Sequence, residues 1–224
     1  MQWLTLLNMS LDGTAIDTIS LLDYLPAYVF PRSAQRISEN IILGVSLGGH
    51  SAWQCVLREK RFNAAVIVIG CPDYVRLMSH RARTSGLDSW CGSTPPGAKF
   101  LGSDDFPNAL IDAVQKGDPA GVFLETRRDR SILYDPQAKG LREAFRESIA
   151  GKRIMVLSGA SDTLVPYSCA KPFMDFLKHE IAADEQLILT KTHIEDILFP
   201  DTGHTMSEQM VQRAVGFIIE AMHK

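Results

Sequence analysis

Short runs of aliphatic and β-branched residues alternate along the chain with stretches whose apolar residues recur every three or four positions. The runs at 40–45, 64–69, 153–158 and 195–199 are predicted as strands, and the run at 40–45 as a strand buried on both faces. Helices are predicted over residues 12–28, 52–60, 108–116, 141–150, 166–181 and from 206 onwards. Because strand, helix and strand follow one another within residues 40–69, we expect an α/β protein whose mostly parallel sheet has about four strands flanked by helices.

The pattern weakens between residues 72 and 151. Loop signals, such as PPG at 95–97 and GSDD at 102–105, separate short helical stretches there. We therefore expect residues 1–71 and 152–224 to form the core of the protein, with residues 72–151 inserted as a helical cap.

Composition and charge limit the classes of partner. The chain has 224 residues, of which 46% are hydrophobic, enough for one sizeable core. Its 23 basic and 26 acidic residues leave a net charge of −3. The densest basic cluster, Arg127, Arg128 and Arg130, is interrupted by Asp129. We expect neither a nucleic-acid nor a membrane partner.

The cysteines and the N-terminus bear on the compartment. Cys55, Cys71, Cys91 and Cys169 are far apart and include no CxxC pair, so neither a disulfide framework nor a zinc site is expected. The N-terminus shows no basic segment followed by a cleavage site, and no segment reaches the length of about 18 apolar residues that spans a membrane. These features predict a cytoplasmic protein that requires no metal or organic cofactor.

The most informative stretch is Gly44-Val45-Ser46-Leu47-Gly48, a GxSxG sequence that follows one predicted strand and precedes a helix. A serine at such a turn has a strained backbone, which small flanking residues permit, and its hydroxyl projects above the sheet. Ser46 is therefore the candidate nucleophile. The alternative is an ordinary glycine-rich turn, since this five-residue pattern is common by chance.

A serine hydroxyl needs a base to accept its proton and an acid to orient that base. His204 is the candidate base, because it directly follows a predicted strand and lies in a glycine-containing loop. His193 is the alternative base. His50, in the first turns of the helix after the serine, is predicted to be structural.

The candidate acid is Asp162, which lies four residues past the predicted strand 153–158. Active-site loops gather at this edge of the sheet in open α/β folds. A turn or helix-capping role is the alternative for Asp162. Asp73 also follows a buried strand and is the alternative acid.

Three segments, GVSLGGH at 44–50, VLSGASDTLVP at 156–166 and PDTGH at 200–204, together resemble an α/β-hydrolase from its nucleophile strand onwards. The order Ser46, Asp162, His204 is the order that this family uses. The resemblance implies an α/β-hydrolase-like sheet, Ser46 as nucleophile, His204 as general base and Asp162 as orienting acid. It also implies that the backbone N–H of Leu47 is one oxyanion donor.

The chain departs from this family before Ser46. Members usually carry several strands there and a loop that supplies a second oxyanion N–H, whereas residues 1–39 contain one predicted helix, a short apolar segment and no HG-type sequence. Loss of one oxyanion donor typically costs about 10² to 10³ in rate. The open edge of residues 41–45 further predicts either cover by Trp3–Met9 or a homodimer formed at that edge or through the N-terminal segment.

Together these features predict a serine esterase or thioesterase that acts through an acyl-enzyme. No cluster of basic residues marks an anion clamp, so a small, largely apolar substrate is expected. A non-catalytic remnant or interaction protein is the alternative, and acyl transfer is a further one, since fold does not fix reaction. Four apolar residues of the expected cap are candidates either for the acyl pocket or for the cap's own core: Trp90, Phe100, Phe106 and Leu110.

Overall fold

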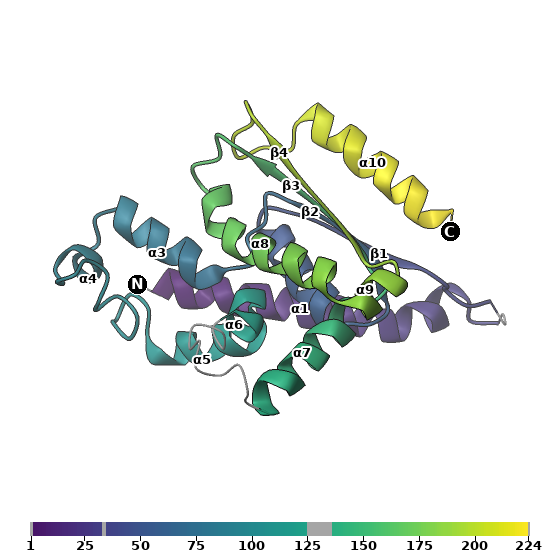
Figure 1. Cartoon of the computed structure of the whole chain (residues 1–224), viewed down its shortest axis with the longest axis horizontal. Coiled ribbons are helices and arrows are strands. Elements are labelled where there is room, and N and C mark those ends of the chain that lie inside the picture. Colours follow the sequence, from purple (N-terminus) through teal and green to yellow (C-terminus); the bar gives the residue numbers. More distant parts are fainter. Residues whose placement is uncertain (1, 33–34, 125–135, 224) are drawn as a thin grey trace.

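A computed structural model describes residues 2–32, 35–124 and 136–223. Within these residues, four strands form one parallel sheet whose spatial order repeats the order along the chain (Figure 1). The strands are β1 (Asn40–Val45), β2 (Phe62–Val68), β3 (Arg153–Gly159) and β4 (His193–Phe199). Each strand pairs in parallel with the next, with one register shift between Asn40 and Ile41, so the predicted mostly parallel sheet is confirmed.

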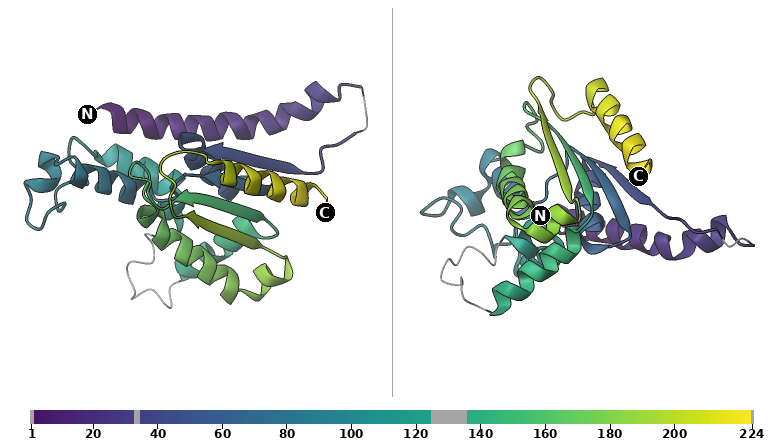
Figure 2. Two further views of the ribbon diagram at one scale, coloured as in Figure 1. Left: turned by 90° about the horizontal axis from the view of Figure 1, so that it is seen from above. Right: turned by 45° about the vertical axis from the view of Figure 1, so that its right-hand side comes forward.

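Helices cover both faces of the sheet. The described helices are α1 (Gln2–Val29), α2 (Leu47–Arg58), α3 (Tyr74–Thr84), α4 (Asp88–Cys91), α5 (Asn108–Gly117), α6 (Pro119–Phe123), α7 (Pro136–Ile149), α8 (Tyr167–Ala183), α9 (Glu185–Leu189) and α10 (Glu208–Met222). Figure 2 shows α10 alone on one side of the sheet, with α8 and the helices of the first half of the chain on the other. The molecule is therefore a three-layer α/β/α structure.

Alternation along β2 explains why both layers are needed. Ala65 and Ile67 are buried against the layer that contains α2 and α8. Ala64, Val66 and Val68 are buried against α10. Successive side chains of a strand point to opposite faces, so the unbroken apolar run at residues 64–68 of β2 is stable only between two helical layers.

β1 is an edge strand, as the expected open edge of residues 41–45 implies, but its predicted burial on both faces is incomplete. Its residues are mostly half-buried, and Leu43 keeps 45% of its surface exposed. In the described sheet β1 pairs with β2 on one side only. The apolar run at 40–45, which is typical of a buried strand, therefore lies at a partly open edge of the sheet.

The N-terminal segment forms one long helix, longer than the predicted 12–28. The backbone of Trp3–Met9 is helical and belongs to α1, whereas the side chains of this segment lie outside the described residues. Further along α1, Ala15 is fully buried and Ile19 and Leu22 pack against the same core. These positions share one helical face, so apolar packing against α2 and α5 holds α1 in place.

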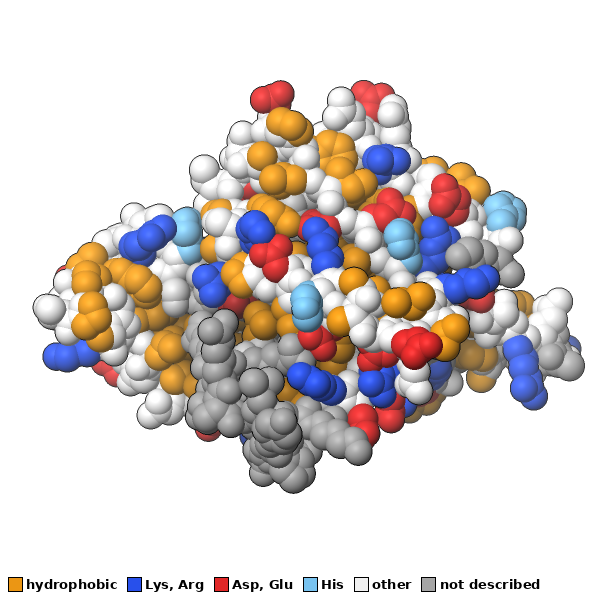
Figure 3. All heavy atoms as spheres, in the orientation of Figure 1, with side chains coloured by type: hydrophobic (Ala, Val, Ile, Leu, Met, Phe, Trp, Pro, Cys, Tyr) orange, Lys and Arg blue, Asp and Glu red, His pale blue; other side chains and the backbone are white. Residues whose placement is uncertain are grey.

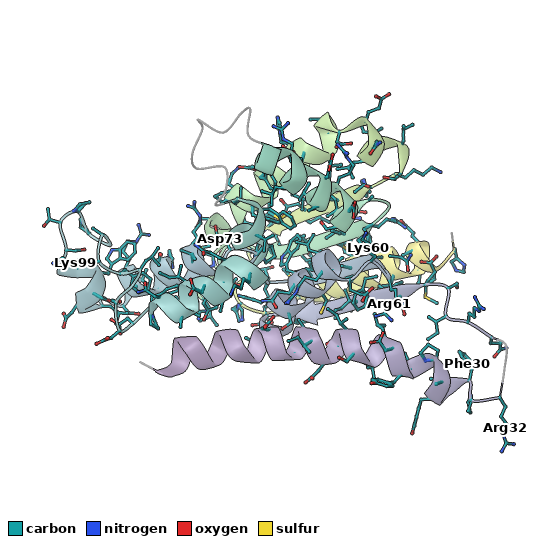
Figure 4. All side chains as sticks on the ribbon, turned by 90° about the horizontal axis from the view of Figure 1, so that it is seen from below. Phe30, Arg32, Lys60, Arg61, Asp73 and Lys99 are labelled. Carbon is teal, nitrogen blue, oxygen red and sulfur yellow. The ribbon has the colours of Figure 1, made fainter. Side chains whose placement is uncertain are left out.

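Ion pairs surround this contact. Arg58 Nη1 lies 2.5 Å from Asp12 Oδ1, and Arg61 Nη1 lies 2.6 Å from Asp23 Oδ1. Figure 4 shows Arg61 where α1 passes the end of the core. Exposed pairs of this kind contribute about 0 to 1 kcal/mol each, so they orient α1 more than they stabilise it.

Residues 72–151 share the core of the sheet. Phe123, Phe145 and Ile149 are buried in the same cluster as Ala65 and Ile67. The division into a core and an inserted cap stays a prediction.

The aromatic residues of this region pack on one another. Phe100 and Phe106 are fully buried with ring centroids 5.4 Å apart, and Trp90 lies edge-on to Phe100 at 5.7 Å. Leu110 is buried in the same cluster. Their surroundings favour the core interpretation over the acyl-pocket interpretation.

Lys152 is a buried cation beneath the helix that carries the elbow. It is 3% exposed, and its Nζ donates to the backbone carbonyls of Val56 at 2.5 Å and Glu59 at 2.7 Å. The last carbonyls of a helix have no partner inside the helix, so this amine caps the end of α2. Burial lowers the pKa of Lys152 from 10.5 to about 8.

Replacement of Lys152 by methionine is expected to lower the free energy of unfolding by about 2 kcal/mol, because two buried carbonyls lose their donor. Between pH 8 and 10.5 the unfolded chain binds more protons at this residue than the folded chain does. Stability of the unmodified protein should therefore gain a contribution as the pH rises through this window, and the variant should lack it. Urea unfolding at pH 7 and 9.5 measures both effects. Lys60→Met, at an exposed residue, is the control; equal behaviour of the two variants would contradict the capping role.

Surface charge follows no single sign on the face shown in Figure 3, where acidic and basic side chains lie interspersed among hydrophobic ones. Among the described residues, no helix is both long enough and apolar enough to cross a membrane.

Candidate active site

Ser46 lies in a strained turn between β1 and α2. Its backbone has φ 54° and ψ −115°, a left-handed conformation that residues with a side chain rarely adopt. The Ser46 N–H donates to the carbonyl of Val68 at 2.9 Å, so the turn stays attached to β2. The strain is therefore held by the sheet, as the elbow interpretation requires.

The glycines around this turn are not equivalent. A Cβ on Gly44 would lie 2.1 Å from the carbonyl oxygen of Gly48, whereas a Cβ on Gly48 would meet nothing within 4 Å. Gly49 and Gly70 touch backbone to backbone, and a Cβ on Gly70 would lie 2.6 Å from the Gly49 carbonyl carbon. This second contact was not predicted, although the sequence carries a signal for it, a glycine directly after a buried strand.

The structure brings the three predicted residues into one hydrogen-bonded chain. Ser46 Oγ lies 2.8 Å from His204 Nε2, and His204 Nδ1 lies 2.8 Å from Asp162 Oδ2. An ionised carboxylate only accepts hydrogen bonds, so His204 Nδ1 carries the proton and Nε2 is free to accept one from Ser46. This arrangement can raise the nucleophilicity of a serine hydroxyl.

The loop after β3 fixes the carboxylate. The Asp162 side chain is fully buried, and its Oδ1 accepts from the N–H groups of Leu164 at 2.9 Å and Val165 at 2.8 Å. Oδ2 is left for His204. The capping and triad roles, alternatives in the sequence, are therefore filled by different oxygens of the same group.

The loop of His204 is attached to the loop of Asp162. Ser161 N–H donates to the Thr202 carbonyl at 3.0 Å, and Ala160 N–H donates to the Phe199 carbonyl at 2.9 Å. A Cβ on Gly159 would lie 2.3 Å from the Thr202 oxygen, so this approach needs glycine. The two loops hold acid and base together.

The alternative residues lie elsewhere. Asp73 caps α3, with Oδ1 accepting from the Arg76 N–H at 2.8 Å, and Figure 4 shows it far along the core from Arg61. The His193 side chain is 56% exposed and begins β4, whereas His204 follows the end of that strand.

His50 supports the turn from within the protein. Its Nδ1 lies 2.9 Å from the Ser46 carbonyl, and the residue is buried. Burial is the main cause that lowers the pKa of His50 to about 4. His50 is therefore neutral near pH 7, and its Nδ1 donates to Ser46, in agreement with its predicted structural role.

α2 presents unpaired N–H groups beside Ser46. Its first hydrogen bond runs from the His50 N–H to the Ser46 carbonyl at 3.1 Å, so the N–H groups of Leu47, Gly48 and Gly49 lie outside the helical ladder. No side chain caps this end of the helix. Such an end attracts developing negative charge, which suits the predicted role of the Leu47 N–H.

Across the part of the chain that the structure describes, no group of three or more His, Cys, Asp or Glu side chains is arranged to hold a metal ion.

No protein-family model and no curated protein matches the sequence. Solved structures do match the fold. Dipeptidyl peptidase 4 of Porphyromonas gingivalis has a TM-score of 0.52 at 11% identity, with 92% of this chain and 22% of that chain covered. An acylaminoacyl peptidase in complex with a chloromethyl ketone has a TM-score of 0.51 at 13% identity, with coverage of 92% and 27%. A single-residue variant of Arabidopsis thaliana SOBER1 has a TM-score of 0.50 at 12% identity, with coverage of 96% and 66%. The chain has the α/β-hydrolase fold.

The chain spans 66% of the SOBER1 chain and about a quarter of each peptidase. Within this α/β-hydrolase fold, the strand before Ser46 is an edge strand of the described sheet. Support for the elbow therefore comes from β2 on one side and from α2 and His50 behind it.

Proposed function

We propose that the protein is a serine hydrolase that cleaves a carboxylic ester or thioester through an acyl-enzyme. The proposal rests on one observation: the unbroken chain of hydrogen bonds from Ser46 Oγ through both nitrogens of His204 to buried Asp162. The fold is compatible with this chemistry without fixing it.

In the proposed reaction, Ser46 Oγ attacks the carbonyl carbon while His204 Nε2 takes the hydroxyl proton. Asp162 keeps the imidazole in the required tautomer and stabilises its positive charge. The Leu47 N–H donates to the oxyanion of the tetrahedral intermediate. His204 then returns the proton to the leaving oxygen or sulfur, and a water molecule activated by His204 releases the acyl group from Ser46.

The non-catalytic alternative has one observation in its favour: residues 1–39 contain no HG-type sequence to supply a second oxyanion donor beside the proposed one, the Leu47 N–H. Labelling by a fluorophosphonate probe separates the two proposals, because the probe reacts only with an activated serine.

We expect stoichiometric labelling of the unmodified protein and none of Ser46→Ala, measured by intact-protein mass. Ser161→Ala is the matched control, because Ser161 is an exposed serine in the adjacent acid loop whose hydroxyl faces the Pro200 carbonyl. It should label like the unmodified protein. An unmodified protein that takes up no label would exclude the hydrolase proposal and leave the non-catalytic one.

The predicted homodimer also remains a proposal. It is supported by the half-exposed Leu43 on edge strand β1 and by the unpaired outer side of that strand in the described sheet.

A further inference from the structure

We infer that Arg81 binds an anionic group of the substrate, so that the hydrolase prefers acyl groups that end in a carboxylate. The inference rests on the proposed function for its kinetic consequence. The sequence predicts a small, largely apolar substrate, because it shows no cluster of basic residues. The inference adds one negatively charged end to that substrate.

Arg81 lies in the last turn of α3, a helix that extends beyond the carboxyl ends of the strands (Figures 1 and 2). Its Nη2 donates to the carbonyl of Leu164 at 3.0 Å. Leu164 belongs to the loop that wraps Asp162, since its own N–H donates to Asp162 Oδ1. The guanidinium is therefore attached to the acid side of the candidate active site.

The acid loop links this guanidinium to the nucleophile, because Asp162 Oδ2 lies 2.8 Å from His204 Nδ1 and His204 Nε2 lies 2.8 Å from Ser46 Oγ. Burial is the main cause that lowers the pKa of His50, and the charge of Arg81 is a minor one. His50 is bonded to the carbonyl of Ser46. Arg81 thus places a positive charge on the acid side of the chain that joins Asp162, His204 and Ser46.

Arg81 lacks the carboxylate partner that other arginines have. Among the described residues, its guanidinium donates to the neutral carbonyl of Leu164, and its Nε is buried without an acceptor. The arginines that pair with an aspartate or glutamate are Arg58, Arg61, Arg76, Arg146 and Arg153.

A half-buried cation without a counter-ion has lost hydration, and the neutral Leu164 carbonyl compensates for only part of that loss. An anion that arrives with the substrate restores what is missing, and the planar fork of a guanidinium matches a carboxylate. Because the side chain is half-buried, solvent still reaches it. A substrate group can therefore reach it too.

The kinetic test compares p-nitrophenyl hemiesters of succinic, glutaric and adipic acid with neutral p-nitrophenyl esters of the same chain lengths. The unmodified protein should favour the best hemiester by about ten-fold or more in kcat/KM, and Arg81→Met should reduce that ratio by about ten-fold. Arg83→Met is the matched control, two residues along the same helix and exposed, and it should keep the ratio. If Arg81→Met lowers both ester classes equally, Arg81 only positions the acid loop and the inference is overturned.

A binding test separates failure of this inference from failure of the proposed function. Glutarate is titrated calorimetrically into Ser46→Ala, which cannot turn over, and into the double variant Ser46→Ala with Arg81→Met. We expect binding to the first and at least about ten-fold weaker binding to the second. Equal or absent binding overturns the inference, even where neutral esters are cleaved. Binding without any hydrolysis supports the anion site and rejects the hydrolase.

Discussion

Asp162→Asn is expected to lower kcat by about 10⁴, the scale set by loss of the correct tautomer in a serine triad. The asparagine oxygen should still accept from the N–H groups of Leu164 and Val165, which hold Oδ1 now. Its amide nitrogen then faces His204 Nδ1 as a donor. His204 Nδ1 must then accept a hydrogen bond instead of donating one, so the ring proton moves to Nε2. His204 can then no longer take the proton of Ser46.

Steady-state kinetics on an activated ester measures this loss, and thermal unfolding checks that the fold is kept. Asp73→Asn is the matched control, because Asp73 also follows a strand but caps α3. It should stay within about three-fold of the unmodified activity, as expected for a residue that does not touch the reacting atoms. An Asp162→Asn variant that keeps more than a tenth of the activity would show that Asp162 is not the orienting acid.

Gly44→Ala is expected to destabilise the protein by about 3 kcal/mol or more, because strain of this kind has no flexible side chain to absorb it. The new methyl group would lie 2.1 Å from the backbone oxygen of Gly48, at the start of α2. Either the turn at Ser46 opens or the helix moves, so activity should fall together with stability.

Gly48→Ala tests the same motif at its other glycine. A Cβ there meets nothing within 4 Å, and alanine favours a helix over glycine by about 1 kcal/mol. This variant should be as stable as the unmodified protein or more so in denaturant unfolding. Similar losses in both variants would mean that the turn is not held as the structure shows.

The strands and the three site residues could be predicted because their signals are local. A buried strand is a short apolar run, and Ser46, Asp162 and His204 each lie within five residues after such a run, in loops with glycine or capping residues nearby. The predicted strands 153–158 and 195–199 agree with β3 and β4 to within two residues at each end.

The rest depended on position in space. The open edge of β1 was expected only from residues 1–39, which offer it no further strand, because nothing within residues 40–45 distinguishes an edge strand from a central one. Arg81 has no motif either, because its place near Leu164 depends on how α3 packs against the start of α8. Gly44 and Gly48 look alike in the motif, and only the path of the backbone distinguishes them.

The order of the strands has a consequence for how the protein folds. Ser46 follows β1 at one edge of the described sheet, and His204 follows β4 at the other. Because spatial order repeats chain order, the sheet can grow by one strand at a time, with the hydrogen bond between Ser46 and Val68 available as soon as β2 has formed. We expect His204 to reach Ser46 only when β4, the last strand, pairs with β3. Contacts between residues that are distant in sequence form slowly. The rate at which activity recovers during refolding would thus report the pairing of β4, whereas the turn at Ser46 would form earlier, when β1 pairs with β2.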